Sequence, residues 1–125
     1  MKVIQIAQRA VDLERATAFY SRLLGAEPLA SFEQSGLVFF DLGGVRLLLE
    51  RGAPPALLYL EQPDLHTAIS RLEGAGVKIV APPQLIFIHP DATLGPAGTE
   101  EWMAFIEDSE GNTVALVSRT PAAGD

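Results

Sequence analysis

The fold is decided by the stretch Asp12-Leu13-Glu14-Arg15-Ala16, because its pattern returns later in the chain as Asp64-Leu65-His66-Thr67-Ala68. The two aspartates are 52 residues apart. Each suits the N-cap of a helix, and apolar residues then follow at helical spacing until Leu24-Gly25 in the first copy and Gly74-Ala75-Gly76 in the second. The repeat predicts two similar halves, each built around one helix.

Strand-like segments surround both predicted helices. Alternating apolar residues precede them at 3–9 and 57–61. Three strands are expected after the first helix, at 29–32, 37–42 and 45–50, and further strands after the second, at 77–80 and after the turn at Gly111-Asn112. We therefore expect an α+β fold of two tandem βαβββ modules, about 1–52 and 55–119, in a single domain 1–120. Residues 120–125 are small and polar, so we expect a frayed tail.

The second half is longer than the first. From the capping aspartate to the turn glycine the halves use 31 and 47 residues, and the 16 additional residues fall largely within 84–99. Residues 86–89 look extended, and residues 90–98 look like a mobile loop. This excursion is a candidate lid or specificity element.

Composition excludes several classes of function. The chain of 125 residues has no cysteine, which removes disulfides, thiolate nucleophiles and zinc–thiolate sites. Its formal net charge is −7 and its nine Lys and Arg residues are scattered, which argues against nucleic acid as a partner. No apolar run is long enough to span a membrane and no signal-peptide pattern opens the chain, so we expect a cytoplasmic protein.

Three segments together resemble a known family. They are Asp12 to Gly25, Asp41-Leu42-Gly43-Gly44-Val45-Arg46-Leu47, and Asp108-Ser109-Glu110-Gly111-Asn112-Thr113-Val114-Ala115-Leu116-Val117. Their order, spacing and duplication resemble the vicinal oxygen chelate superfamily, which contains glyoxalase I, bleomycin and fosfomycin resistance proteins, extradiol dioxygenases and methylmalonyl-CoA epimerase. The resemblance implies two modules of curved mixed sheet around a shared cavity, and a homodimer.

The resemblance also implies where a metal would bind. In metal-using members the ligands come from the first and last strands of each module, and the corresponding residues here are Gln5, Leu47, Leu57 and Ala115. Only Gln5 offers a donor atom, and a divalent cation needs several. We therefore expect no metal and no cofactor in the standard site. A slip of one residue would bring in Ile4 or Ile6, Glu50 and Ser118, but it would also exchange the two faces of the strands.

Strand alternation predicts what lines the cavity. If Gln5 faces inward, so do Val3, Ala7 and Arg9, and in the second half Leu57, Tyr59 and Glu61 do the same. Arg9 and Glu61 either pair with each other or leave Arg9 to receive a ligand carboxylate or phosphate. A mainly apolar cavity with such polar fittings suits a small organic molecule.

The last strands add further candidates. Residues 99–107 alternate, with Glu101 and Met103 on one face and Trp102 on the other, so one set lines the cavity and the other meets the second helix. Trp102 is either packing or part of a cage for a cationic ligand. The predicted ligand-binding residues are Gln5, Arg9, Leu47, Leu57, Tyr59, Glu61, Trp102, Met103 and Ala115.

Titratable groups give two catalytic candidates. His89 ends an apolar segment and leads into the long loop, so it is either a hydrogen-bonded structural residue or the natural proton carrier. Glu101 is the carboxylate candidate. His66, in the first turn of a helix, is expected to be exposed. The acidic residues Glu107, Asp108 and Glu110 are interpreted as a solvated turn without a catalytic role.

Two functions follow from these observations. We favour a dimeric, metal-independent protein that binds a small organic molecule, resembling the resistance-protein branch. The alternative is a lyase or isomerase resembling lactoylglutathione lyase or the epimerase. It would use either metal-free proton transfer by His89 or a glutamate, or a non-standard metal site drawn from Gln5, Glu50, Glu61, His89 and Glu101. Loss of small-molecule function in favour of an interaction module is a third possibility that nothing in the sequence favours.

Overall fold

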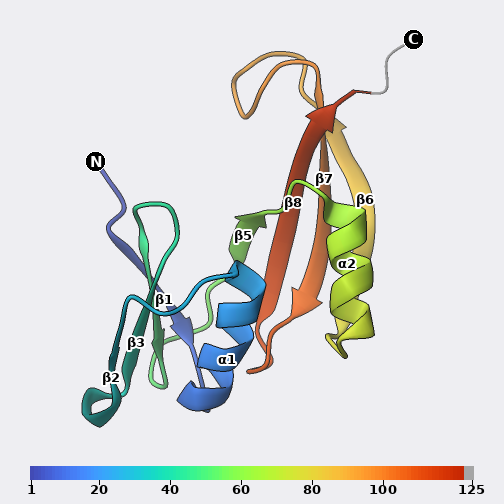
Figure 1. Cartoon of the computed structure of the whole chain (residues 1–125). Coiled ribbons are helices and arrows are strands. Elements are labelled where there is room, and N and C mark those ends of the chain that lie inside the picture. Colours follow the sequence, from blue (N-terminus) through green and yellow to red (C-terminus); the bar gives the residue numbers. More distant parts are fainter. Residues whose placement is uncertain (123–125) are drawn as a thin grey trace. The chain divides into compact units, whose positions relative to one another are not determined.

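The computed structural model describes residues 1–122, and the chain divides into two units (Figure 1). Unit 1 comprises Met1–Ala56 together with Asp108–Asn112, and unit 2 comprises Leu57–Glu107 together with the chain from Thr113 onward. Each unit holds one four-stranded mixed sheet and one α-helix. The predicted α+β class with two modules is confirmed.

Unit 1 follows the predicted order of strand, helix and three strands. Its elements are β1 (Gln5–Arg9), α1 (Leu13–Leu24), β2 (Ala30–Phe32), the 3-10 turn η1 (Glu33–Ser35), β3 (Leu37–Asp41) and β4 (Arg46–Glu50). The order across the sheet is β1-β4-β3-β2, with β1 parallel to β4 and the other pairs antiparallel.

Unit 2 repeats this topology with longer strands. Its elements are β5 (Leu58–Glu61), α2 (Leu65–Gly74), β6 (Ile79–Ile88), β7 (Thr99–Glu107) and β8 (Thr113–Pro121). The order across the sheet is β5-β8-β7-β6, and β5 is parallel to β8. The longest helix of residues 1–122 has 12 residues, and none is long and apolar enough to cross a bilayer.

The helices begin and end where the sequence predicts, although their caps differ. Asp12 accepts a hydrogen bond from the backbone N–H of Arg15 at 3.1 Å, and Gly25 takes the left-handed conformation with φ of 66°. Asp64 occupies the corresponding position before α2, but its side chain makes no capping hydrogen bond. The second helix is therefore held by its buried face, formed by Leu65, Ala68 and Ile69.

Some of the additional residues of the second half extend a β-hairpin made of β6 and β7, and the others form the loop between these two strands. β6 continues through Pro82 and Pro83 and joins the two extended segments that we expected to be separate. Its pairing with β7 shifts register on both sides of these prolines, as expected for residues that lack an N–H donor on an edge strand. Between β6 and β7 lie His89 and the loop 90–98.

The expectation of a frayed end from residue 120 was wrong. Thr120 and Pro121 belong to β8, paired with Glu100 and Thr99, and the N–H of Ala122 donates to Gly98 at 2.9 Å. Pairing with the lengthened β7 explains the order of these small residues. The rest of the expected tail, residues 123–125, lies outside the described residues.

Candidate functional sites on the two sheets

The helix covers one face of the unit 1 sheet and leaves the other open. Gln8 marks the covered face, because its side-chain amide lies 3.5 Å from the hydroxyl of Tyr20 in α1. Strand pairing places Leu49 with Gln8 and Leu47 with Ile6 on that face. The opposite face, which we call open face 1, is formed by Gln5, Ala7, Arg9, Leu37, Phe39, Asp41, Arg46, Leu48 and Glu50.

Leu47 was therefore assigned to the wrong face. Leu47 and Leu49 are fully buried on the face that α1 covers, which Ile6 shares, whereas Gln5 lies on open face 1. The residue that shares this face is Leu48, the partner of Ala7. The turn contains two glycines, Gly43 and Gly44. The position four residues after the turn glycine is Leu47 if Gly43 is taken and Leu48 if Gly44 is taken, and strand pairing favours Leu48. The correction exchanges one leucine for another, so the position still lacks a donor atom.

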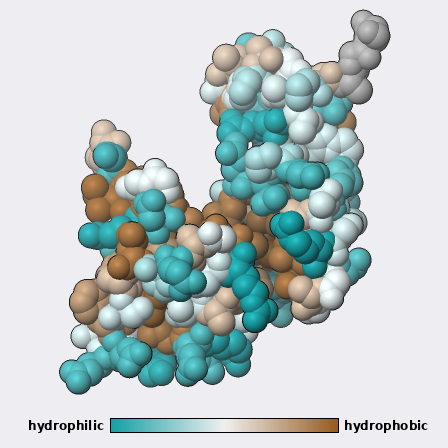
Figure 2. Space-filling model, in the orientation of Figure 1, coloured by the Kyte–Doolittle hydropathy of each residue, from teal (hydrophilic) through white to brown (hydrophobic). Residues whose placement is uncertain are grey.

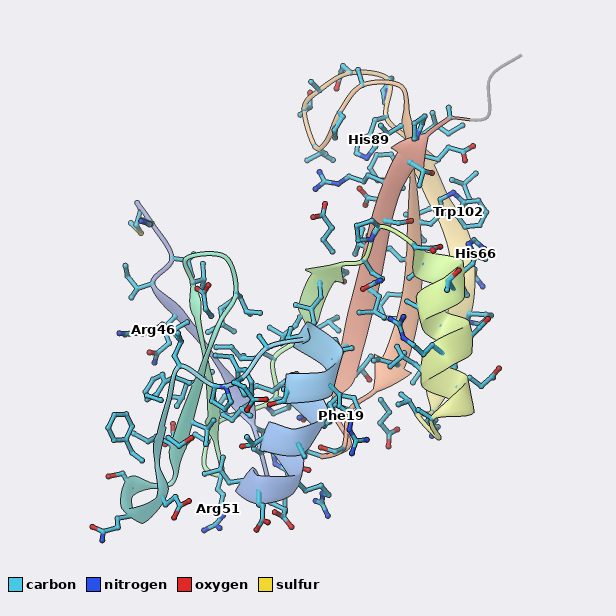
Figure 3. All side chains as sticks on the ribbon, viewed as in Figure 1. Phe19, Arg46, Arg51, His66, His89 and Trp102 are labelled. Atoms are coloured by element: carbon cyan, nitrogen blue, oxygen red, sulfur yellow. The ribbon has the colours of Figure 1, made fainter. Side chains whose placement is uncertain are left out.

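An arginine that the sequence analysis did not single out lies beside Gln5. Arg46 is the cross-strand partner of Gln5, and its Nε donates a hydrogen bond to Gln5 Oε1 at 3.0 Å. The guanidinium carbon is 5.8 Å from the centre of the Phe39 ring, within the range of a cation–π contact. Figure 3 shows Arg46 on the side of the sheet away from α1. The only signal in the sequence was its position beside the turn glycines.

Apolar side chains accompany these polar groups. Phe39 and Phe32 pack edge to face with their ring centres 6.0 Å apart, and Phe32 is 53% exposed. Figure 2 shows apolar residues exposed on unit 1 next to hydrophilic ones. The arrangement offers an apolar surface with a few directed polar groups, the usual composition of a small-molecule site.

The open face of unit 2 carries most of the residues predicted for that half. Tyr59 pairs with Ala115, and the Tyr59 ring lies 6.4 Å from Phe105. Met103 and Glu61 are both cross-strand partners of Val117, so they share this face, which we call open face 2. Leu57 is 50% exposed just before β5, where alternation places it with Tyr59.

Trp102 does not belong to this set. Its ring centre is 5.3 Å from that of His66 in α2, so it lies on the face that the helix covers (Figure 3). A residue at an even position of β7 cannot share a face with Met103. The interpretation of Trp102 as part of a ligand cage was wrong. His66 itself is exposed, as predicted.

The two catalytic candidates, His89 and Glu101, lie together on unit 2. His89 Nε2 is 3.0 Å from Glu101 Oε1, although the residues are separated by 12 positions in the sequence. The His89 side chain is 1% exposed and that of Glu101 is 13% exposed. Figure 3 shows His89 where β6 ends and the loop 90–98 begins. Both side chains are therefore largely shielded from water.

The loop packs directly on this pair. The N–H of His89 donates to Thr99, and the N–H of Gly98 donates to His89, so both ends of the loop are fixed. A side chain at Gly95 would come within 2.8 Å of His89 Cε1 and 3.1 Å of Arg119 Nη1. Arg119 also lies 3.6 Å from Glu61, a partner that the sequence analysis did not consider.

In the turn 108–112 the two acidic side chains, Asp108 and Glu110, are buried, so the expectation that they are solvated was wrong. Asp108 and Glu110 are 5% and 6% exposed, and Glu107 alone is partly exposed. Tyr20 donates to Asp108 Oδ2 at 2.6 Å, which satisfies one carboxylate. Burial, followed by this hydrogen bond, raises the pKa of the Tyr20 phenol.

Glu110 is held by a second set of donors. Arg15 Nε and Nη2 donate to its two oxygens at 2.7 and 3.1 Å, and the backbone N–H of Asp12 donates at 2.6 Å. Burial acts to raise the pKa of Glu110, but the hydrogen bonds from Arg15, Asp12 and Ser109 outweigh it and lower the pKa. The turn is therefore a structural part of unit 1.

The described part of each unit holds no recognisable metal site. Taken separately within residues 1–122, neither brings together three or more His, Asp or Glu side chains that could hold an ion. At the positions that the resemblance implies for metal ligands, unit 1 has Gln5 and Leu48 and unit 2 has Leu57 and Ala115. Gln5 alone has a donor atom, and its oxygen already accepts a hydrogen bond from the guanidinium of Arg46. These residues do not fit a divalent cation.

Comparison with known proteins agrees with the architecture. Residues 2–116 match the family model described as Glyoxalase/Bleomycin resistance protein/Dioxygenase superfamily. No curated protein matched the chain.

Solved structures similar to the chain share its fold. A superfamily member from Sphaerobacter thermophilus DSM 20745 is 21% identical with a TM-score of 0.70, covering 94% of this chain and 97% of that one. A virulence protein from Salmonella typhimurium is 18% identical with a TM-score of 0.67, covering 94% and 96%. Lactoylglutathione lyase from Agrobacterium tumefaciens is 20% identical with a TM-score of 0.63, covering 94% and 92%.

Proposed function

Because the chain belongs to the Glyoxalase/Bleomycin resistance protein/Dioxygenase superfamily, we propose that it uses this scaffold to bind a small organic molecule without the superfamily's usual metal. The observation that carries the proposal is the set of residues at the metal positions. Gln5, Leu48, Leu57 and Ala115 provide one amide oxygen, which Arg46 already engages. Binding of an organic molecule needs a complementary surface and no cation, so it does not depend on the metal-ligating residues that are absent here.

The two open faces support this proposal. Each combines apolar side chains, such as Phe39 in unit 1 and Met103 in unit 2, with a small number of fixed polar groups. We propose that a small molecule binds on one of these open faces. Pairing of modules between two copies would make a homodimer, which light scattering on the purified protein would test.

A ligand screen in the presence and absence of EDTA tests metal-independent binding. A ligand present at 100 times its Kd stabilises the folded state by about 2.7 kcal/mol, which is easily seen as a rise in melting temperature. We expect the same rise with and without the chelator. If EDTA removes the stabilisation by every ligand found, metal-independent binding is wrong.

One observation favours a second function, metal-free proton transfer by a lyase or isomerase. His89 and Glu101 form a shielded pair at 3.0 Å, an arrangement in which a carboxylate can orient an imidazole. Against this, the His89 side chain is 1% exposed and packs under the loop 90–98, so a substrate would need the loop to open. The pair equally explains how the loop is anchored.

Substitution of the pair separates catalysis from anchoring. If the protein is such an enzyme, His89→Ala abolishes turnover, and Glu101→Gln lowers kcat and shifts the pH profile for a substrate found by screening. A purely structural pair would instead lower the melting temperature and leave any binding by the open faces measurable. Unchanged rates in both variants would remove His89 and Glu101 from any mechanism.

A further inference from the structure

We propose that Arg46, held in place by Gln5 and Phe39, is the anchor for a carboxylate group on the bound molecule. The inference deepens the proposed function, on which it rests, by naming the chemical class of the ligand: an apolar or aromatic body that carries a carboxylate. Neither the superfamily match nor the resemblance assigns a role to this arginine.

Two contacts orient the guanidinium. Its Nε donates to Gln5 Oε1 at 3.0 Å, and its carbon lies 5.8 Å from the centre of the Phe39 ring. The contacts come from β1 and β3, the strands on either side of β4, so the side chain is braced from both directions. An arginine fixed in this way loses less conformational freedom on binding than a free one.

The donors that remain match a carboxylate. Arginine has five N–H donors in a planar fork, and the hydrogen bond to Gln5 uses the one on Nε. The two Nη groups can therefore meet both oxygens of a carboxylate. Since Gln5 Oε1 is occupied, the free part of that amide is its NH2 group, a further donor at the same place. An anion finds partners here, whereas a metal ion would face a guanidinium.

Nearby acidic groups leave the charge of Arg46 uncompensated. Within unit 1, all of which is described, no carboxylate forms an ion pair with Arg46. Its cross-strand neighbour Asp41 accepts a hydrogen bond from the backbone N–H of Gly44 at 3.0 Å, a contact within the turn. Although the whole chain has a net charge of −7, the guanidinium of Arg46 presents a positive charge on open face 1.

An apolar surface lies next to the guanidinium. Ala7 and Leu48 form the next cross-strand pair after Gln5 and Arg46, and Phe39 is the partner of Leu48 on the other side. Phe32 extends the surface through its contact with Phe39. A ligand whose carboxylate meets Arg46 would place its apolar body over Phe39 and Phe32, and it would bury part of the exposed area of Phe32, which is 53% exposed.

Paired fragments test the assignment. Calorimetric titration would compare benzoate, 2-naphthoate and indole-3-carboxylate with their primary amides, which have nearly the same shape and no charge. We expect the carboxylates to bind the wild-type protein about tenfold more tightly than the amides, as for charge-assisted hydrogen bonds. The Nε–Hε signal of Arg46 should shift during an NMR titration with the carboxylate.

Arg46→Gln should reduce the ratio of the two affinities to about one without lowering the melting temperature, since the side chain is exposed. Arg51→Gln is the matched control, because it makes the same charge change beyond the other end of β4 (Figure 3). Arg46→Lys keeps the charge but not the planar fork, and should give an intermediate ratio.

Three results would overturn the inference. Equal binding of carboxylates and amides would show that no anion is recognised, while binding itself would still support the proposed function. A preference that survives in Arg46→Gln, or that disappears equally in Arg51→Gln, would show that Arg46 is not the anchor. Absence of binding by either set would exclude this ligand class, and the broader screen with EDTA would then decide the proposed function separately.

Discussion

At the scale of single residues, the hydroxyl of Tyr20 holds a buried carboxylate. It donates to Asp108 Oδ2 at 2.6 Å, and Asn112 Nδ2 donates to the same oxygen at 2.9 Å. In Tyr20→Phe the buried oxygen keeps one donor of two. We expect a loss of about 1–3 kcal/mol in the free energy of unfolding, measured by urea denaturation.

Tyr59→Phe is the matched control for this change. Tyr59 is 55% exposed, and its hydroxyl forms no hydrogen bond within the described residues of unit 2. Removing it should change stability by less than about 0.5 kcal/mol. Equal effects of the two substitutions would show that the contact with Asp108 contributes nothing.

Glu110 gives a pH dependence with a defined sign. The pKa of Glu110 is lowered in the folded protein from an ordinary value of 4.5, so its ionised form stabilises the fold. This stabilisation is complete above about pH 4.5 and is lost as the pH falls through the folded pKa. Glu110→Gln should be less stable than wild type by about 1–3 kcal/mol at pH 7, and the difference should shrink below about pH 4.5.

Denaturation of both proteins across pH 3–7 would measure this effect. Glu107→Gln serves as control, because Glu107 lies 3.4 Å from an exposed Lys78, and such surface pairs contribute about 0–1 kcal/mol. A stability difference for Glu110→Gln that stays constant over this range would contradict the account.

At the scale of elements, the parts that the sequence predicted well are those determined by neighbours in the chain. The helix after Asp12 depends on its cap, its spacing of apolar residues and Gly25, all within 14 residues. The turn 108–112 was misread because its partners, Arg15 and Tyr20, lie 95 and 88 positions away. Acidic residues in a turn look solvated until the donors that bury them are known.

The candidate site shows the same division. Alternation placed Tyr59 and Glu61 on one face of β5, and strand pairing puts Met103 of β7 on that same face. It could not decide which face of β7 met the helix, so Trp102 was assigned to the ligand. Arg46 was missed because its importance comes from a cross-strand contact with Gln5, which is 41 positions away.

The loop 90–98 depends on a glycine at its centre. In Gly95→Ala the new methyl group would lie within 2.8 Å of the buried His89 ring, which is held by Glu101 and cannot move easily. We expect the loop to detach from His89, with faster hydrogen exchange at the N–H of Gly98. The free energy of unfolding should fall by about 1–3 kcal/mol.

Gly74→Ala is the matched control. It lies at the end of α2 with open space around the new methyl group and without a positive φ, so the change should be neutral or slightly stabilising. Unchanged exchange at Gly98 in Gly95→Ala would show that the loop does not depend on this contact.

At the scale of the whole molecule, the duplication is clear in the topology and does not extend to metal-binding residues at the positions that the resemblance implies. Both units share the same strand order and a parallel pair formed by their first and last strands. In these parallel pairs Leu48 corresponds to Ala115. Leu48 pairs with Ala7, two residues after Gln5, and Ala115 pairs with Tyr59, two residues after Leu57. Neither carries a donor, so two copies of the scaffold offer one amide oxygen at the family's metal positions.

Metal content and metal affinity test the central claim most directly. The protein would be purified without chelators, analysed for metals by mass spectrometry, and titrated with nickel, zinc and manganese in a calorimeter, with Gln5→Ala in parallel. The account predicts far less than one metal per chain, no saturable binding, and the same result for the variant. Stoichiometric metal in the wild-type protein that is lost in Gln5→Ala would contradict it.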